Sequence, residues 1–325
     1  MTFSVSFSTV VDPVLRWNAS GITVAGITGR SGANESQLNN PWGLVLTYDR
    51  TLYVADRFNS RIQKFPSNSK QGTTVAGSAN GTPNTTLNSL YYPAKIVLDS
   101  NDNLYIADAF NSRALFWPKN SNSGVFIAGT GTAGNAFNQL NCSYDIARDL
   151  NLDITYVLDY GNDRILGYKP GNITGFVVAG GNGPGPSYTQ LNGPIAMHFD
   201  SVTNSLFIAN FNRHNIVRWT LGANNWTLVA GNINGILGST STSLYFPTGL
   251  TLDPMGNLYV ADLFNHRIQL FLNGEMNGTT IAGVTGQLGN DSVSLNQPYT
   301  VALDNQLNLY VADNQNHRIQ KFLRY

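Results

Sequence analysis

Short hydrophobic runs recur along the whole chain and are separated by turn-forming residues. In residues 95–129, for example, the runs read KIVLD, LYIAD, RALFW and VFIAG. Each run alternates apolar and polar residues or is continuously apolar, as in β-strands of about five residues. Gly, Asn, Asp and Pro interrupt the runs at intervals of roughly 8–12 residues, and no window has the length of a helix. The pattern therefore predicts an all-β protein.

The runs belong to a repeat with a period of 51 or 52 residues. One segment reads LYVADRFNSRIQKF from Leu52 and LYVADLFNHRIQLF from Leu258. Its other copies begin at Leu104, Thr155, Leu206 and Leu309. A second marker, VAG or IAG, begins at Val24, Val75, Ile127, Val178, Val229 and Ile281. A third marker, L-x-x-P, shares the same period with one lapse, so three independent patterns define the same repeat.

Each repeat contains four strands, which is the content of one propeller blade. We therefore predict a single domain over residues 1–325, a six-bladed β-propeller of four-stranded antiparallel blades. Residues 1–37 form an N-terminal segment, and the blades begin near residues 38, 90, 140, 191, 244 and 295.

The two ends of the chain are predicted to complete one blade together. The last repeat ends at Tyr325 after its third strand, and residues 22–26 supply the missing outer strand with its VAG marker. Pairing the ends removes an open sheet edge. Residues 14–17, VLRW, resemble a surplus third strand, because residues 318–322 already provide that strand. Either residues 3–17 form an overhang or the sequence is cut from a longer array.

Aspartate and arginine recur together beside the turn between the second and third strands. The pairs are Asp56/Arg61, Asp108/Arg113, Asp159/Arg164, Asp262/Arg267 and Asp313/Arg318. In the fourth repeat the two positions hold Asn210 and Asn215, so the acid and the base are lost together. This joint loss predicts a structural ion pair and not a set of catalytic carboxylates. The recurrent asparagines Asn59, Asn111, Asn162, Asn265 and Asn316 are expected to bond the backbone of the same turn.

These markers together closely resemble the NHL repeat. His266-Arg267-Ile268 and His317-Arg318-Ile319, each preceded by Asn, match the signature of that family, and the resemblance extends from about Gly21 onward. It implies a propeller that commonly has six blades and mostly serves as an interaction module attached to larger proteins, such as RING-type ubiquitin ligases, sensor kinases and receptors. Some similar propellers are enzymes, namely an amidating lyase and calcium-dependent lactonases, with a metal in the central channel.

Composition narrows the classes of partner. Charged residues are 12% of the chain, the net charge is 0, and no cluster of Lys or Arg is present. This argues against nucleic acid as a partner. The single cysteine, Cys142, excludes an internal disulfide, and no Cys/His cluster suggests structural zinc.

The sequence leaves the cellular location open. It has no run of 18 apolar residues for a membrane span, and residues 1–11 lack the features of a signal peptide. N-glycosylation sequences (N-x-S/T) would suit an extracellular glycoprotein. They begin at Asn18, Asn34, Asn80, Asn84, Asn141, Asn172, Asn225, Asn277 and Asn290. Extracellular and cytoplasmic locations both remain open, as does the choice between a monomeric domain and a part of a larger chain.

The enzyme hypothesis meets a departure from the family pattern. In the lyase, ligand histidines lie at or near the residue after the L-x-x-P proline. Here the residues at that position are Trp42, Ala94, Tyr144, Ile195, Thr248 and Tyr299. Only His198 lies outside the repeat pattern, in a first strand where it points either to the channel or to the core. No cofactor is expected, although calcium or zinc in the channel is not excluded.

The candidate binding residues are those that the repeats do not share. They are Trp42, Lys95, Tyr144, Asp145 and Tyr299 near the proline position and Phe58, Phe110 and Phe264 in the turns. Aromatic residues on the loops of a rigid frame suit recognition of a protein, peptide or glycan. Two structural alternatives stay open: the aromatics wedge between blades, and Lys95 and Asp145 only pair with each other. The sequence favours a binding scaffold over a metal-dependent lyase or hydrolase acting in the channel.

Overall fold

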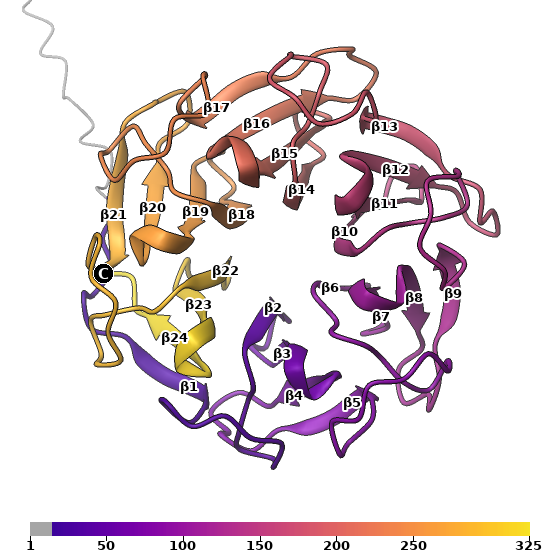
Figure 1. Cartoon of the computed structure of the whole chain (residues 1–325). Coiled ribbons are helices and arrows are strands. Elements are labelled where there is room, and N and C mark those ends of the chain that lie inside the picture. The colour runs from indigo at the N-terminus through magenta and orange to yellow at the C-terminus, as the bar shows by residue number, and fades with distance from the viewer. Residues whose placement is uncertain (1–14) are drawn as a thin grey trace, which may run out of the picture.

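A computed structural model describes residues 15–325, which form a ring of six four-stranded antiparallel sheets (Figure 1). The first strand of each repeat lies next to the central axis, and the later strands follow outward (Figure 1). The predicted all-β, six-bladed β-propeller is confirmed. Among the described residues, no helix has the length and apolar character needed to cross a membrane.

The blades are numbered in chain order, and the strands of each blade are given from the axis outward. Blades 1 to 3 contain β2 (Pro41–Leu46), β3 (Leu52–Asp56), β4 (Arg61–Phe65), β5 (Thr73–Gly77); β6 (Ile96–Leu98), β7 (Leu104–Asp108), β8 (Arg113–Trp117), β9 (Val125–Ala128); and β10 (Ser143–Asp149), β11 (Ile154–Asp159), β12 (Arg164–Tyr168), β13 (Phe176–Gly180). Blades 4 to 6 contain β14 (Pro194–Asp200), β15 (Ser205–Asn210), β16 (Asn215–Thr220), β17 (Thr227–Gly231); β18 (Pro247–Leu252), β19 (Leu258–Asp262), β20 (Arg267–Phe271), β21 (Gly278–Gly283); and β22 (Pro298–Leu303), β23 (Leu309–Asp313), β24 (Arg318–Phe322), β1 (Ile22–Gly26).

The ring closes as expected, because β1 is the outer strand of blade 6. It pairs antiparallel with β24, with Ile22 opposite Lys321 and Gly26 opposite Arg318. Gly26 has a φ of +81°, and a Cβ there would lie 2.2 Å from the carbonyl oxygen of His317. Only glycine fits this close approach in a left-handed conformation.

The expected surplus strand does not form within the described part of residues 14–17. Trp17 makes only an isolated bridge to Arg324. Its indole Nε1 donates a hydrogen bond of 2.8 Å to the Leu307 carbonyl, and the ring packs edge-on against Tyr259. The rest of the predicted overhang, residues 3–14, lies outside the described residues.

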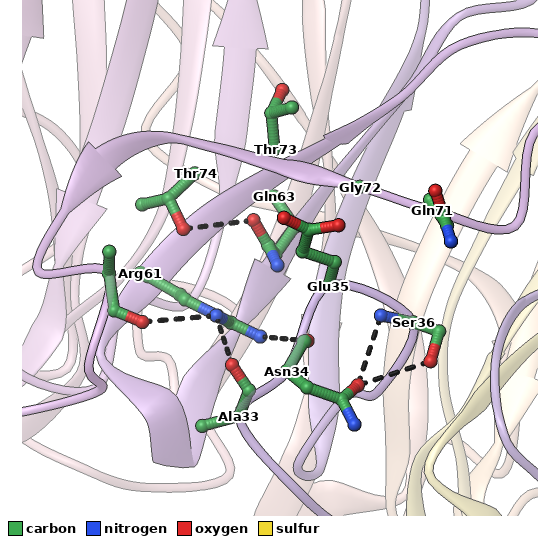
Figure 2. Close-up of a pocket in the computed structure, with 11 residues that line it drawn as sticks. Ala33, Asn34, Glu35, Ser36, Arg61, Gln63, Gln71, Gly72, Thr73 and Thr74 are labelled. Carbon is green, nitrogen blue, oxygen red and sulfur yellow. Dashed lines mark hydrogen bonds between the residues drawn. The ribbon is translucent and has the colours of Figure 1, made fainter.

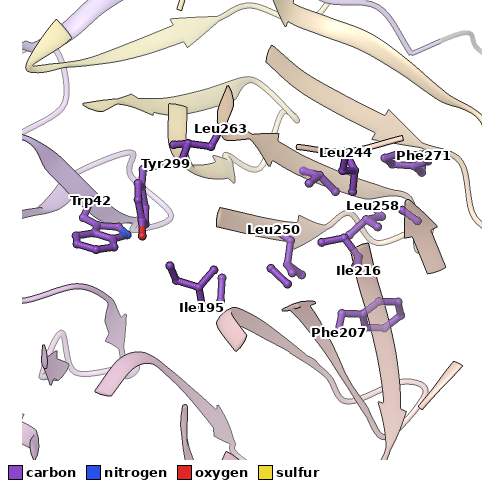
Figure 3. Packing of buried hydrophobic residues seen from close by; sticks show 14 residues of the cluster. Trp42, Ile195, Phe207, Ile216, Leu244, Leu250, Leu258, Leu263, Phe271 and Tyr299 are labelled. Carbon is purple, nitrogen blue, oxygen red and sulfur yellow. The ribbon is translucent and has the colours of Figure 1, made fainter. Parts of the chain in front are cut away.

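The core lies between neighbouring blades. In one cluster, Leu44, Leu52 and Val54 of blade 1 pack against Tyr310 and Ile319 of blade 6. Another cluster joins blades 4 and 5 and reaches Trp42 and Tyr299 (Figure 3). Because each apolar face is covered by the next blade, no blade buries its core alone.

A single 3-10 turn connects the second and third strands of every blade. The turns are η1 (Arg57–Asn59), η2 (Ala109–Asn111), η3 (Tyr160–Asn162), η4 (Phe211–Arg213), η5 (Leu263–Asn265) and η6 (Asn314–Asn316). Each ends on a left-handed residue with φ between 47° and 56°. We call these residues the belt: Ser60, Ser112, Asp163, His214, His266 and His317.

The belt links each blade to the next. Nδ1 of His317 accepts a hydrogen bond of 3.2 Å from the backbone amide of Asn40, which precedes the L-x-x-P proline of blade 1. Ser60 accepts the equivalent bond from Tyr92 of blade 2 at 3.4 Å. The other four belt residues accept the corresponding amides of Cys142, Gly193, Phe246 and Gln297. Three histidines, two serines and one aspartate therefore link the blades at equivalent positions.

Candidate functional site

The five aspartate–arginine pairs are in direct contact in the structure. In each, the arginine Nε lies 2.7–2.9 Å from a carboxylate oxygen of the aspartate, and both side chains are buried. In blade 1, the other oxygen of Asp56 accepts the amide of Asn39 at 2.6 Å. The Arg61 Nη groups donate to carbonyls of the preceding loop, including those of Ala33 and Asn34. Each pair therefore fixes the loop that leads into its own blade.

Blade 4 replaces the missing pair in a way that the sequence did not reveal. Asn210 keeps one bond of the aspartate by accepting the amide of Asn192 at 2.7 Å. The indole Nε1 of Trp226 donates to the carbonyls of Gln190 and Ser187 at 2.8 and 3.2 Å. These are the loop carbonyls that correspond to the arginine acceptors in other blades. Trp226, which lies in the connection between β16 and β17, therefore binds the loop in place of the missing arginine.

An open groove of about 710 Å³ lies at the outer edge of blade 1. Figure 2 shows Arg61, Gln63 and Thr74 on one wall and residues 33–36 on the other. Every N–H group of the Arg61 guanidinium already donates to Asp56 or to a loop carbonyl, and Gln63 is bonded to Thr74 at 3.1 Å. The cation in this groove has no donor left for a ligand.

The predicted aromatic residues near the proline position meet over the axis. The Trp42 ring packs edge-on against Tyr299 of blade 6 with centroids 3.9 Å apart, as Figure 3 illustrates, and its centroid lies 5.3 Å from that of Tyr144 of blade 3. Trp42 and Tyr299 are only 8% and 9% exposed. Burial also raises the pKa of the Tyr299 hydroxyl well above its usual value, so it stays protonated. These side chains therefore close the mouth of the channel and do not stand out from the face.

The turn phenylalanines remain accessible. Phe58, Phe110 and Phe264 are 42%, 43% and 38% exposed. Phe58 and Phe110 both pack against Tyr92, with centroids 5.1 Å away in each case. Phe264 packs in the same way on Tyr245 and Phe246 of blade 5. The face therefore carries two patches of accessible aromatic surface, over blades 1 and 2 and over blades 4 and 5.

Tyr92 and Phe246, on which the turn phenylalanines pack, have strained backbone conformations. The residue before the L-x-x-P proline position is left-handed in every blade, with φ between 51° and 58°. Asn40 and Gly193 suit that conformation, whereas Tyr92 and Phe246 do not. A bulky residue in this region costs of order 1–3 kcal/mol and persists where the surrounding structure holds the backbone in that conformation. Because all six blades share the conformation, the repeat backbone itself imposes the strain at Tyr92 and Phe246.

Arg57, the first residue of η1, lies among the aromatics of blades 1 to 3. Its guanidinium carbon is 3.4 Å from the Trp42 ring centre, a close cation–π contact. The centres of four other rings lie within 5.3–6.0 Å, those of Phe58, Tyr92, Phe110 and Tyr144. We call this group of Arg57 and five rings the arginine cage.

The guanidinium of the cage has no counter-ion among residues 15–325. None of the ion pairs of the described chain involves Arg57. Its Nε is buried and has no hydrogen-bond partner. Burial lowers the pKa of Arg57, although an arginine keeps its charge in a folded protein. The cage is thus a cationic centre whose hydrogen-bonding capacity is unused.

Arg57 was not among the predicted binding residues. The equivalent turn positions hold Ala109, Tyr160, Phe211, Leu263 and Asn314. Arg57 is therefore the only charged residue at this turn position, and this difference between the repeats could have indicated a site. Its significance depends on rings from three blades, which the repeat pattern does not bring together.

Lys95 and Asp145 pair with each other inside the ring, as the structural alternative expected. Their charged atoms are 3.8 Å apart, and Asp145 also accepts the amides of Ile146 and Met197. Burial raises the pKa of Asp145, and Lys95 opposes this shift. His198 lies near enough to Lys95 for that charge, together with the larger effect of burial, to lower the pKa of its imidazole to about 4. Within residues 15–325, no three His, Cys, Asp or Glu side chains form a group that could hold a metal ion.

A closed ring of six four-stranded blades, with a belt of bonds between them, defines a six-bladed β-propeller. The family model for the NHL repeat matches residues 38–65, 244–271 and 295–322. The first three strands of blades 1, 5 and 6 therefore match the NHL repeat, in agreement with the sequence markers.

Known proteins agree with this assignment. The chain is 37% identical over 98 residues to human NHL repeat-containing protein 2, a match that covers 28% of this chain and spans only 13% of the length of that relative. An auxiliary nutrient binding protein from Bacteroides thetaiotaomicron superposes with a TM-score of 0.69 at 15% identity, covering 95% of this chain and 77% of that one. A gluconolactonase from Xanthomonas campestris gives 0.64 at 11% identity, covering 97% and 99%. At this identity the two structures share the fold alone.

Proposed function

We propose that the chain is a non-enzymatic binding module that recognises a protein, peptide or glycan at the face formed by the L-x-x-P segments and the 3-10 turns. The observation that carries the proposal is the accessible aromatic surface of Phe58 and Phe110, which lies over a cation that no described residue pairs. Accessible aromatic side chains on a rigid frame are the residues that dominate binding energy at interfaces. The repeats do not need this surface for folding, because their shared residues already build the core and the loops.

The second candidate is a metal-dependent lyase or hydrolase that acts in the channel. Calcium needs six to eight oxygen ligands, and catalytic zinc needs three protein ligands. Among residues 15–325 no three His, Cys, Asp or Glu side chains lie together, and the inner-strand carboxylate of Asp145 is already bound by an ammonium and two backbone amides. This residue set does not fit either metal, and the proposal requires none.

Removal of the accessible rings tests the binding proposal. The double substitution Phe58→Ser and Phe110→Ser should weaken the best binder found on peptide and glycan arrays by tenfold or more, since truncation of such aromatics commonly costs over 1 kcal/mol. Phe176→Ser is the matched control, because Phe176 is 42% exposed but lies on the outer strand β13. Equal binding by both variants would contradict the proposal.

A further inference from the structure

We infer that the arginine cage binds a carboxylate of an acidic peptide, an inference that rests on the proposed function and names the chemistry of its ligand. The inference starts from the contrast between two neighbouring arginines. Arg61 uses all its donors inside the protein, whereas no residue of the described chain pairs with Arg57. A buried Nε–H without an acceptor costs free energy, and a partly buried cation is normally paired. A ligand carboxylate satisfies this requirement.

The geometry of the cage suits a planar anion. The Trp42 ring covers one face of the guanidinium at 3.4 Å. Arginine binds carboxylates through its edge, with two parallel N–H donors, so stacking on one face leaves this mode available. The surrounding rings leave the arginine only partly exposed, so charge-assisted hydrogen bonds there are stronger than in open water.

The walls of the cage favour peptide over glycan. A sugar ring stacks on an open aromatic face, but the Trp42 indole is buried and already carries the guanidinium. The exposed rings nearest to the cation are those of Phe58 and Phe110, at 5.5 and 5.3 Å. These apolar rings fit the hydrophobic side chains that flank an acidic residue.

The charge of the cage favours a monoanion over a phosphate. Arg57 is the one cation in the cage, and the ammonium of Lys95 in blade 2 pairs with Asp145 at 3.8 Å. A phosphate dianion bound here would therefore keep about one uncompensated charge in a partly buried site. A carboxylate carries the single charge that one arginine neutralises.

Two peptides and four proteins test the inference by isothermal titration calorimetry. The probes are N-acetyl-Phe-Asp-Phe-amide and its Asn counterpart, which differ in one charge. The wild type is expected to bind the Asp peptide at least tenfold more tightly than the Asn peptide. Arg57→Gln should abolish this preference, Arg57→Lys should retain a smaller part, and Lys70→Gln, in the exposed β4–β5 loop, should leave it unchanged.

The outcomes separate this inference from the proposed function. Equal binding of the two peptides by the wild type, no binding of either, or a preference that survives Arg57→Gln would overturn it. Tighter binding of glucuronate or phosphotyrosine than of the Asp peptide would also overturn it. Loss of array binding in the Phe58→Ser and Phe110→Ser protein would still support the proposed function in each case. Thermal unfolding gives a further readout, because Arg57→Gln should not lower Tm if the guanidinium serves a ligand and not the fold.

Discussion

Replacement of Asp262 by Asn is expected to lower the free energy of unfolding by about 3–5 kcal/mol, because it breaks a buried ion pair from one side. One Asp262 oxygen accepts both Asn265 Nδ2 at 2.8 Å and Arg267 Nε at 2.9 Å. In the variant, the amide either presents its NH₂ group to these two donors or gives up the bond to the Tyr245 amide. The Arg267 charge then remains buried without a counter-ion.

Urea unfolding of matched variants measures this effect. Asp102→Asn is the control, because Asp102 forms an exposed pair with Lys119 and its removal should cost less than about 1 kcal/mol. The double substitution Asp262→Asn and Arg267→Asn copies blade 4 and should cost less than the sum of its single changes. It should not restore full stability, because blade 5 lacks a counterpart of Trp226. Strict additivity, or equal costs at Asp262 and Asp102, would show that the pair is not a buried structural unit.

Acidification from pH 7.5 to pH 5 is expected to destabilise the ring through the belt histidines. Burial lowers the pKa values of His214, His266 and His317 below 6.5. The folded state therefore binds fewer protons than the unfolded state, so stability is greatest above about pH 6.5 and falls as the pH drops toward the folded pKa values. We therefore expect a lower Tm at pH 5 than at pH 7.5.

The belt itself provides the control for this prediction. Blades 1 and 2 use Ser60 and Ser112 at the equivalent left-handed positions. The triple variant His214→Ser, His266→Ser and His317→Ser should keep the inter-blade bonds and show a smaller decrease in Tm between pH 7.5 and pH 5. His198, with its pKa lowered to about 4, also destabilises the protein in acid but is present in both proteins. Parallel Tm curves for the two proteins would contradict the assignment.

Much of the fold could be predicted from the sequence because the repeat is local. A blade is a run of neighbouring strands, so strand order and the aspartate–arginine pairs follow from features within one period. Ring closure by residues 22–26 follows from the one strand that the last repeat lacks. The compensation by Trp226 did not follow, since this residue lies outside the shared markers. Only the folded blade brings its indole to the loop carbonyls of Ser187 and Gln190.

The candidate site was predicted only in outline. The sequence placed Trp42, Tyr144 and Tyr299 on one face, but their depth depends on how closely the inner strands approach each other across the ring. Gly43 illustrates this approach, because a Cβ there would lie 2.3 Å from the Ala94 carbonyl oxygen of the next blade. At such spacing the large rings near the proline position bury one another over the axis. The accessible aromatic surface is therefore that of Phe58, Phe110 and Phe264.

Hydrogen–deuterium exchange with and without the tightest array binder tests the central claim, that this face recognises a partner. The account predicts slower exchange at η1 and η2 and at the L-x-x-P segment around Tyr92. Slower exchange confined to the outer groove at residues 33–36 and 71–74, or to the opposite-face loops such as residues 47–51, would contradict it.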